Sequence, residues 1–277
     1  TVAAVREQVG KGITAMLPTE DAAIVSGLLR DRFGLPLWQF TVSATDANRH
    51  VIRYSRMITG RSKIIVIDRC YHGSVDETFA TLDAAGNTIK REGNIGAPID
   101  LAETTRVVDF NDLAAMDKAL AHGDVAAILM EPAMTNIGIV LPEPGYLEGV
   151  GALAKKYGAV WIIDETHTIS VGPGGMTKKY KLKPDMLTIG KAIAGGLPTG
   201  TFGMTKAIAD QIAAKVKREI VDTGGIGSTL AGNALSAAAM RVTLKSVLNE
   251  KNFKKMIALG TRWSDGVDAA INEFNLP

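Results

Sequence analysis

The segment that decides the fold is residues 125–164, VAAILMEPAMTNIGIVLPEPGYLEGVGALAKKYGAVWIID. It opens and closes with short continuous apolar runs, at 125–130 and 159–163, which are typical of strands buried on both faces. Between them, residues 145–157 carry apolar side chains at helical spacing and stop at Gly158. A strand, a helix and a strand in this order predict a parallel βαβ unit.

The same alternation continues along the rest of the chain, which predicts an α/β fold with a mostly parallel sheet. The loop at 84–100 is long and contains glycine, and loops of that length are often functional. The two strands of the opening segment are expected at 125–132 and 159–164. Further strands are expected at 63–68, 107–110, 185–190 and 201–204. Further helices are expected at 19–33, 45–58, 112–122, 205–218, 231–249 and 252–275.

Composition sets broad limits on partners and compartment. The chain has 277 residues, a net charge of +2 with both signs scattered, and a single cysteine, Cys70, so it can form no internal disulfide. We therefore predict neither a nucleic-acid nor a membrane partner and expect a cytoplasmic protein. No apolar run approaches the roughly 20 residues of a membrane helix. The chain begins at Thr1 and stops at Pro277 directly after a helical pattern, so we expect it to be part of a longer protein.

Reactive side chains follow several of the expected strands, at the edge where open α/β sheets bind ligands. Lys191 follows the strand at 185–190 and is flanked by glycines. A lysine there is either an exposed loop residue or an amine used as a covalent nucleophile, with its pKa lowered by burial. The glycines favour the second interpretation, because they let backbone approach a bulky ligand.

Asp164 and Glu131 follow two other strands, and Tyr71 and His72 follow the strand at 63–68. Asp164 either caps the next turn or holds a proton on a ring nitrogen, and its ionisation after an apolar strand requires a cationic partner. Tyr71 is either a half-buried aromatic or a stacking platform for a flat cofactor. His72 is expected to be hydrogen-bonded within the fold, and no histidine has the spacing of a metal site, so we assign no metal.

Two helix starts could bind phosphate. The sequence TVSATDAN at 41–48 has Ser43 and Asp46 in the spacing of a capping box. The same helix start offers free N–H groups and hydroxyls at Ser43, Ala44 and Thr45 to an anion. The second start is GGIGSTLAGN at 224–233, which otherwise predicts a glycine loop with a helix cap.

The order of these motifs resembles the class III aminotransferases, fold-type-I enzymes that use pyridoxal phosphate, and within them the branch that contains glutamate-1-semialdehyde aminomutase. The resembling stretches cover nearly the whole chain: GRSKIIVIDRCYHG (60–73), the run at 130–165, LKPDMLTIGKAIAGGLPTG (182–200) and STLAGN (228–233). The resemblance implies a large domain with a mostly parallel seven-stranded sheet at 1–250. It also implies the start of a small C-terminal domain at 251–277.

The resemblance also implies roles for individual residues. Lys191 would form the Schiff base with the cofactor and shuttle a proton, and Asp164 would keep the pyridine nitrogen protonated. Tyr71 would stack on one face of the ring, next to His72, and Thr166 would pack on the other. Further expected contacts are Ser43, Ala44 and Thr45 with the phosphate, Asn136 near the ring hydroxyl, Glu131 behind the site, and Thr229 with the phosphate of the partner in a homodimer.

The sequence departs from the family pattern in the loops that shape the substrate pocket. Thr166 stands where valine is usual, and the segment ISVGPGG at 169–175 replaces a common continuation. The amino donor and the keto or aldehyde acceptor are therefore not predicted. The main expectation is an aminotransferase acting on small molecules. An aminomutase of the glutamate-1-semialdehyde type, a racemase and a non-catalytic homologue that binds the cofactor are the alternatives.

Overall fold

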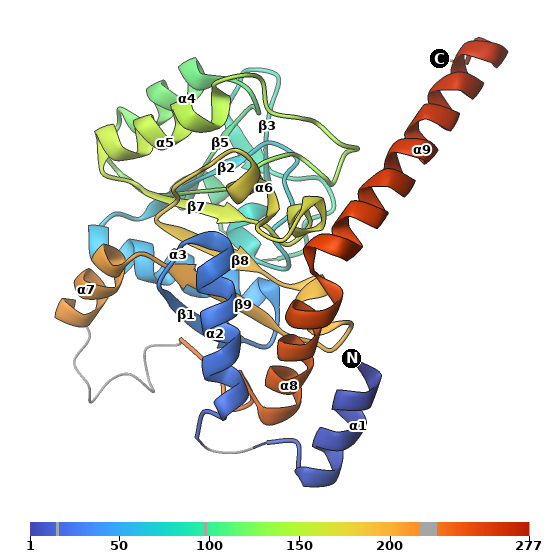
Figure 1. Ribbon diagram of the computed structural model, residues 1–277. Helices are drawn as coiled ribbons and strands as arrows, with labels where there is room; N and C mark the ends of the chain where they lie inside the picture. Colours follow the sequence, from blue (N-terminus) through green and yellow to red (C-terminus); the bar gives the residue numbers. More distant parts are fainter. Residues whose placement is uncertain (15–16, 97–98, 216–225, 277) are drawn as a thin grey trace.

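The computed structural model describes residues 1–14, 17–96, 99–215 and 226–276, and a seven-stranded sheet forms its centre (Figure 1). The strands of this sheet lie in the order β1-β9-β8-β7-β6-β2-β5, and only β9 runs antiparallel to its neighbours. The predicted α/β fold with a mostly parallel sheet is therefore confirmed. The strands are β1 (Leu37–Thr41), β2 (Lys63–Ile67), β5 (Thr105–Val108), β6 (Val125–Met130), β7 (Val160–Asp164), β8 (Met186–Ile189) and β9 (Gly200–Met204).

Helices cover the sheet, and a small hairpin of β3 (Ala80–Leu82) and β4 (Thr88–Lys90) stands beside it. Every residue of β6, β7, β8 and β9 is buried, which explains why these strands have continuous rather than alternating apolar sequences. The helices are α1 (Val2–Lys11), α2 (Glu20–Phe33), α3 (Ala44–Thr59), α4 (Leu113–Leu120), α5 (Tyr146–Tyr157), α6 (Gly175–Lys179), α7 (Lys206–Lys215), α8 (Ala234–Val242) and α9 (Glu250–Phe274).

The side chains of β8 pack into two apolar clusters. Met186 packs with α3, whereas Leu187 and Ile189 pack with α2 and α8. Because successive side chains of a strand point to opposite faces, α3 lies on one face of the sheet here and α2 with α8 on the other. Burial of each large apolar side chain contributes roughly 1.5–3 kcal/mol, so this packing fixes α3 firmly against the strands.

Several predicted boundaries shift for local physical reasons. The helix predicted at 231–249 begins only at Ala234, because the Asn233 side chain caps it by accepting a hydrogen bond from the Ser236 amide (2.9 Å). Its last part, Thr243–Val247, is a π-helical turn. The long loop at 84–100 contains β4, and the part of the predicted helix 205–218 beyond residue 215 lies outside the described residues.

The sequence patterns missed α1, α6, β1 and both strands of the hairpin, β3 and β4. β1 is half-buried and follows Pro36, so it lacks both a continuous apolar run and a clean alternation.

The C-terminal helix α9 projects away from the body of the protein (Figure 1). Of its 25 residues only Phe253 is buried. The proposed start of a second domain near residue 251 coincides with this helix and stays a prediction. Among the described residues, no helix is both long and apolar enough to cross a membrane.

Candidate active site

A cavity of about 870 Å³ opens at the carboxyl-end edge of the sheet. The strands β1, β2, β6, β7 and β8 end at this edge, and residues that follow them line the cavity. This is the position at which open α/β sheets bind ligands. Predicted site residues that line this cavity are Ser43, Ala44, Thr45, Tyr71, His72, Glu131, Asp164, Thr166 and Lys191. The structure thus brings together residues that lie up to 148 positions apart in the sequence, between Ser43 and Lys191.

Lys191 is the first residue of a short 3-10 turn after β8 and has a left-handed backbone conformation (φ 46°). A non-glycine residue rarely adopts this conformation, which costs of order 1–3 kcal/mol and is concentrated at functional sites. Its side chain is exposed to the cavity rather than buried. Of the two interpretations, the one that required a buried amine does not match this exposure, and no hydrogen bond or ion pair to a described residue holds the side chain.

The glycines around Lys191 serve a purpose that the sequence reading did not assign. A Cβ on Gly190 would stand 2.8 Å from Ala44 Cβ, and one on Gly200 would collide with the backbone of Ser43. Both glycines therefore make room for the start of α3, while Gly195 and Gly196 line the cavity. The absence of side chains at Gly190 and Gly200 brings the Lys191 turn directly against the amino end of that helix.

Asp164 ends β7 and is 97% buried, with a dense set of hydrogen-bond donors around its carboxylate. His72 Nδ1 and Asn48 Nδ2 each lie 2.9 Å from Oδ2, and the Thr166 amide donates to Oδ1 at 3.0 Å. Burial raises the pKa of Asp164, but these donors outweigh it and lower the pKa below its ordinary value. The carboxylate is therefore charged at neutral pH.

His72 is the cationic partner that an ionised Asp164 requires. Its side chain is fully buried beside Asp164. Burial alone lowers the pKa of His72, while the neighbouring Cys70 and Asp164 raise it, and the net effect is a pKa well above the ordinary value. His72 Nε2 is buried and has no hydrogen-bond partner among the described residues.

Glu165 follows Asp164 directly but points away from the cavity. It accepts hydrogen bonds from the Thr168 hydroxyl (2.5 Å), from the Thr177 hydroxyl (2.6 Å) and amide (2.5 Å), and from the Met176 amide (3.2 Å). Burial raises the pKa of Glu165, and these donors oppose that increase. Of the adjacent acids, one faces the cavity and the other holds the segment 168–177 together.

The first turn of α3 forms one wall of the cavity, and Ser43 caps this helix. Ser43 Oγ accepts from the Asp46 amide (3.1 Å) and lies 2.9 Å from Asp46 Oδ2, to which it donates. Thr45 Oγ1 accepts from the Ser74 amide (3.2 Å), which leaves its own proton free to donate. The amides of Ala44 and Thr45 stand in the first turn, where a helix offers them no acceptor. An anion at this end would meet Ala44 and Thr45, since the Ser43 hydroxyl is already engaged.

Tyr71, Thr166 and Glu131 complete the wall. Tyr71 is 43% exposed and stands edge-on to Phe79, with 6.2 Å between ring centroids. Thr166 Oγ1 and Glu131 Oε1 are buried without a hydrogen-bond partner among the described residues, while Glu131 Oε2 accepts from Thr135. Buried polar atoms without partners are costly, so these atoms mark positions where a bound molecule would supply a missing hydrogen bond.

Two predicted residues lie outside the cavity. Asn136 is exposed, and its amide lies 3.5 Å from the Arg69 carbonyl oxygen. Thr229 is exposed in the turn before α8. Conversely, the sequence patterns did not predict Asn48, which lines the cavity, or Thr188, whose hydroxyl donates to Asn48. Asn48 could have been found in the sequence as a polar residue on the buried face of α3, because Val51 and Ile52 lie on the same face.

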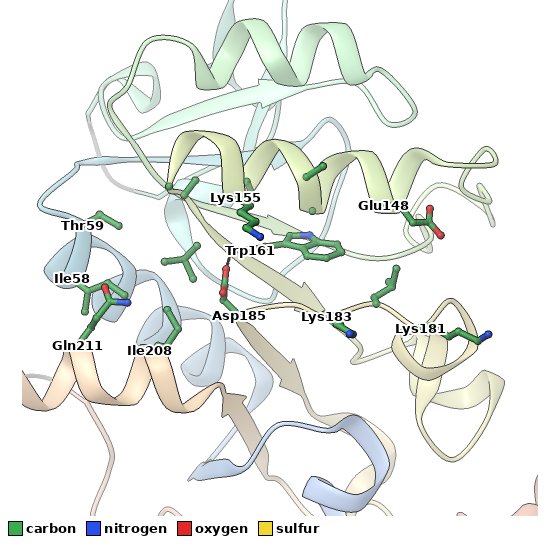
Figure 2. Close-up of a pocket in the computed structure, with 17 residues that line it drawn as sticks. Ile58, Thr59, Glu148, Lys155, Trp161, Lys181, Lys183, Asp185, Ile208 and Gln211 are labelled. Atoms are coloured by element: carbon green, nitrogen blue, oxygen red, sulfur yellow. Dashed lines mark hydrogen bonds between the residues drawn. The ribbon is translucent and has the colours of Figure 1, made fainter.

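A second pocket, of about 620 Å³, lies at the opposite edge of the sheet, where β7 and β8 begin (Figure 2). Trp161 and Asp185 form its floor, and the Asp185 carboxylate accepts a hydrogen bond from the Trp161 amide (2.9 Å). None of the predicted site residues lines it. The groups with complementary chemistry therefore gather at the other edge.

Comparison with known proteins agrees with this geometry. Residues 1–273 match the family model described as "Aminotransferase class-III". The chain belongs to the class-III aminotransferase family. This family uses pyridoxal phosphate as its cofactor, and two solved relatives share the fold of this chain.

Among class-III relatives, a glutamate-1-semialdehyde 2,1-aminomutase of Anaeromyxobacter dehalogenans is 34% identical over 277 residues, which are 99% of this chain and 63% of the relative. A solved glutamate-1-semialdehyde aminomutase from Pseudomonas aeruginosa PAO1 is 46% identical, with a TM-score of 0.96 over 100% of this chain and 62% of that one. A lysine-to-alanine variant of it was solved in complex with PMP.

An omega-transaminase from Sphaerobacter thermophilus is 27% identical, with a TM-score of 0.89 over 100% of this chain and 64% of that one. This chain thus spans a little over three fifths of the length of these relatives.

Proposed function

We propose that the cavity at the carboxyl-end edge binds pyridoxal phosphate and that the protein moves an amino group with it. The observation that carries this proposal is the placement of Lys191 and the ionised Asp164 on the walls of one cavity. The cavity volume of about 870 Å³ suits a cofactor together with a small substrate. The unpartnered Thr166 Oγ1 in its wall fits a bound polar molecule.

When bound, pyridoxal phosphate supplies an aldehyde carbon for amines and a ring that withdraws electrons. Lys191 Nζ would hold the cofactor covalently and afterwards carry a proton. Asp164 would hold the proton on the ring nitrogen, because a buried carboxylate that stays charged stabilises a cation beside it. Tyr71 and Thr166 would flank the ring, and the Tyr71 side chain would exclude water from one face.

The phosphate would bind at the amino end of α3. The Ala44 and Thr45 amides and the Thr45 hydroxyl would donate hydrogen bonds to it, and the helix dipole favours an anion there. We keep Ser43 in the proposed set as the cap that fixes this end. Its hydroxyl would need to leave Asp46 before it could contact the phosphate.

The reaction that we favour is the aminomutase reaction, in which the amino group moves within one molecule of glutamate 1-semialdehyde. The 46% identity to a named aminomutase, against 27% to a named transaminase, supports this choice. It reverses the order that the motifs alone suggested, in which an aminotransferase came first. Transamination between two molecules is the second candidate.

The cofactor assignment is tested by trapping. The purified protein is loaded with pyridoxal phosphate and reduced with borohydride, and its peptides are analysed by mass spectrometry. We expect the reduced cofactor on Lys191, and none on Lys191→Ala. Lys206, whose Nζ lies 2.7 Å from Asp210 away from the cavity, provides a control variant, Lys206→Ala, that should still be labelled. Labelling spread over surface lysines would refute the assignment.

The reaction type is tested by following products. With glutamate 1-semialdehyde alone, the aminomutase proposal predicts an isomer of equal mass and no free keto compound. With an added amine donor, a transaminase would release the keto product of that donor in proportion to the aminated acceptor. Stoichiometric keto product would replace the first candidate by the second.

A homodimer is part of the proposal. Thr229 is exposed and outside its own cavity, which leaves it available to the cavity of a second copy.

A further inference from the structure

A buried polar chain connects β8 to the Asp164 carboxylate through α3. Thr188 Oγ1 lies 2.7 Å from Asn48 Oδ1, and Asn48 Nδ2 lies 2.9 Å from Asp164 Oδ2 and 3.1 Å from the His72 carbonyl oxygen. Asn48 and Thr188 have no exposed surface. In a buried site, each of these hydrogen bonds is stronger and its loss more costly than at the surface.

The neighbours of Asn48 permit only one orientation of its amide. Its Nδ2 faces two acceptors, the carboxylate of Asp164 and the carbonyl of His72. A flipped amide would place its oxygen against both and leave two buried acceptors without donors. Thr188 completes the arrangement, because its hydroxyl donates to Oδ1 and so holds the amide in place.

We propose that Asn48, held by Thr188, is a positioning residue that fixes the orientation of the Asp164 carboxylate toward the cavity. This inference rests on the proposed function, because the group that the carboxylate would serve is the ring nitrogen of the cofactor. Asp164 Oδ2 receives two side-chain donors, from Asn48 and His72, whereas Oδ1 receives only the Thr166 amide. Oδ1 is therefore the oxygen with capacity for a further N–H.

Removal of Asn48 would change the basicity of the Asp164 carboxylate as well as its orientation. A carboxylate with fewer donors is less stable as an anion and therefore more basic. It would then draw the shared proton away from the ring nitrogen. The other titratable groups around it are His72 in contact, Cys70 beside His72, and Glu131 and Lys191 in the walls of the same cavity.

The test compares three variants of the full protein. Asn48→Leu removes both hydrogen bonds donated by Nδ2 while keeping the same branched arrangement of four side-chain heavy atoms, and Thr188→Val removes only the hydroxyl that holds the amide. Ser55→Ala is the matched control, because Ser55 is also buried on α3 but donates to the Val51 carbonyl oxygen (2.7 Å), away from the site. The readout is the ¹⁵N NMR shift of labelled pyridoxal phosphate bound to each protein, followed over pH.

We expect the apparent pKa of the ring nitrogen to fall by about one unit in Asn48→Leu, a roughly tenfold loss of proton affinity that corresponds to one hydrogen bond to a charged group. Thr188→Val should shift it in the same direction by less, and Ser55→Ala should leave it unchanged. An unchanged titration in both Asn48→Leu and Thr188→Val would overturn the proposal. If Asn48→Leu fails to fold, the comparison of the ring-nitrogen pKa between Thr188→Val and Ser55→Ala tests the proposal instead.

A second readout uses the cofactor-free protein. The pKa of the Asp164 carboxyl group, followed by NMR, should rise in Asn48→Leu, because a carboxylate that has lost a donor is less stable as an anion. No binding of pyridoxal phosphate by the unaltered protein would refute the proposed function, and the Asp164 titration would then decide alone whether Asn48 controls the carboxylate. An Asp164 pKa that does not move would refute that control.

Discussion

At the scale of single residues, neighbouring side chains in the sequence serve different parts of the molecule. Asp164 faces the cavity, while Glu165 ties together the segment up to Thr177. Gly175 belongs to this second arrangement. Its backbone is left-handed (φ 58°), and a Cβ there would collide with the Glu165 carboxylate.

Gly175→Ala should therefore destabilise the protein by about 2–4 kcal/mol, from left-handed strain and a disturbed buried carboxylate. Urea unfolding measures the loss. Gly27→Ala is the control, since Gly27 lies within α2 with open space around it and should gain about 0.5–1 kcal/mol. Equal stabilities for the two variants would contradict this account of Gly175.

The His72–Asp164 pair makes stability depend on pH. The pKa of His72 is raised in the folded state, so its contribution is complete below its unfolded pKa of about 6.5 and is lost as pH rises through the higher folded value. The pKa of Asp164 is lowered, so its contribution is present above an unfolded pKa of about 3.9 and is lost as pH falls through the folded value.

We expect the free energy of unfolding of the cofactor-free protein to decrease as pH rises above about 6.5. His72→Asn keeps a donor near Asp164 but cannot be charged. The difference in the free energy of unfolding between this variant and the unaltered protein should therefore shrink toward alkaline pH. Urea unfolding from pH 6 to 9 measures both. A difference that stays constant over this range would argue against a charged His72.

At this scale, the strand-end rule predicted several of the polar residues that line the cavity. Asp164, Tyr71 and Lys191 were predicted because polar residues stand directly after apolar runs. Asn48 could not be found in that way, since its partner Thr188 is 140 positions away and only the packing of α3 brings the two together. Asn136, which was expected from the family resemblance, lies outside the cavity and is exposed beside the Arg69 carbonyl oxygen.

At the scale of elements, α3 combines a structural cap with a candidate phosphate site. Ser43 satisfies the helix end through Asp46, whereas the Thr45 hydroxyl has a proton to donate. Ser43→Ala should cost about 1 kcal/mol of stability, as is typical for a lost cap. Thr45→Val should weaken the affinity for pyridoxal phosphate more than Ser43→Ala does.

Urea unfolding and equilibrium titration with the cofactor separate these two effects. If Ser43→Ala weakened the affinity for pyridoxal phosphate more than Thr45→Val does, the Ser43 hydroxyl would be the group that contacts the phosphate.

The buried strands and amphipathic helices were predictable because burial dictates their sequence period. β1, the hairpin and α1 were not, because they are short or half-exposed and their residues meet both solvent and protein. The π-helical turn after α8 is likewise set by tertiary packing rather than by a local sequence signal.

At the scale of the whole molecule, the proposed homodimer makes a separate prediction. Thr229→Ala should weaken cofactor affinity while sedimentation velocity still gives a dimer, because the hydroxyl would act in the neighbouring cavity. Ser228→Ala, the adjacent exposed hydroxyl, is the matched control and should bind the cofactor normally. A monomer that binds the cofactor with undiminished affinity would refute the role of a second copy.

The two glycine contacts at the amino end of α3 also have a consequence for engineering. Gly190 and Gly200 press the turn that carries Lys191 and the start of β9 against Ala44 and Ser43, so the spacing between the lysine and the helix end is set by backbone against backbone. Side-chain substitutions in the cavity wall can reshape the region where a substrate would lie. If the phosphate binds as proposed, however, a cofactor analogue with a longer phosphate arm would require a redesigned main chain. The close packing of Gly190 and Gly200 against α3 sets the distance between Lys191 and the helix end.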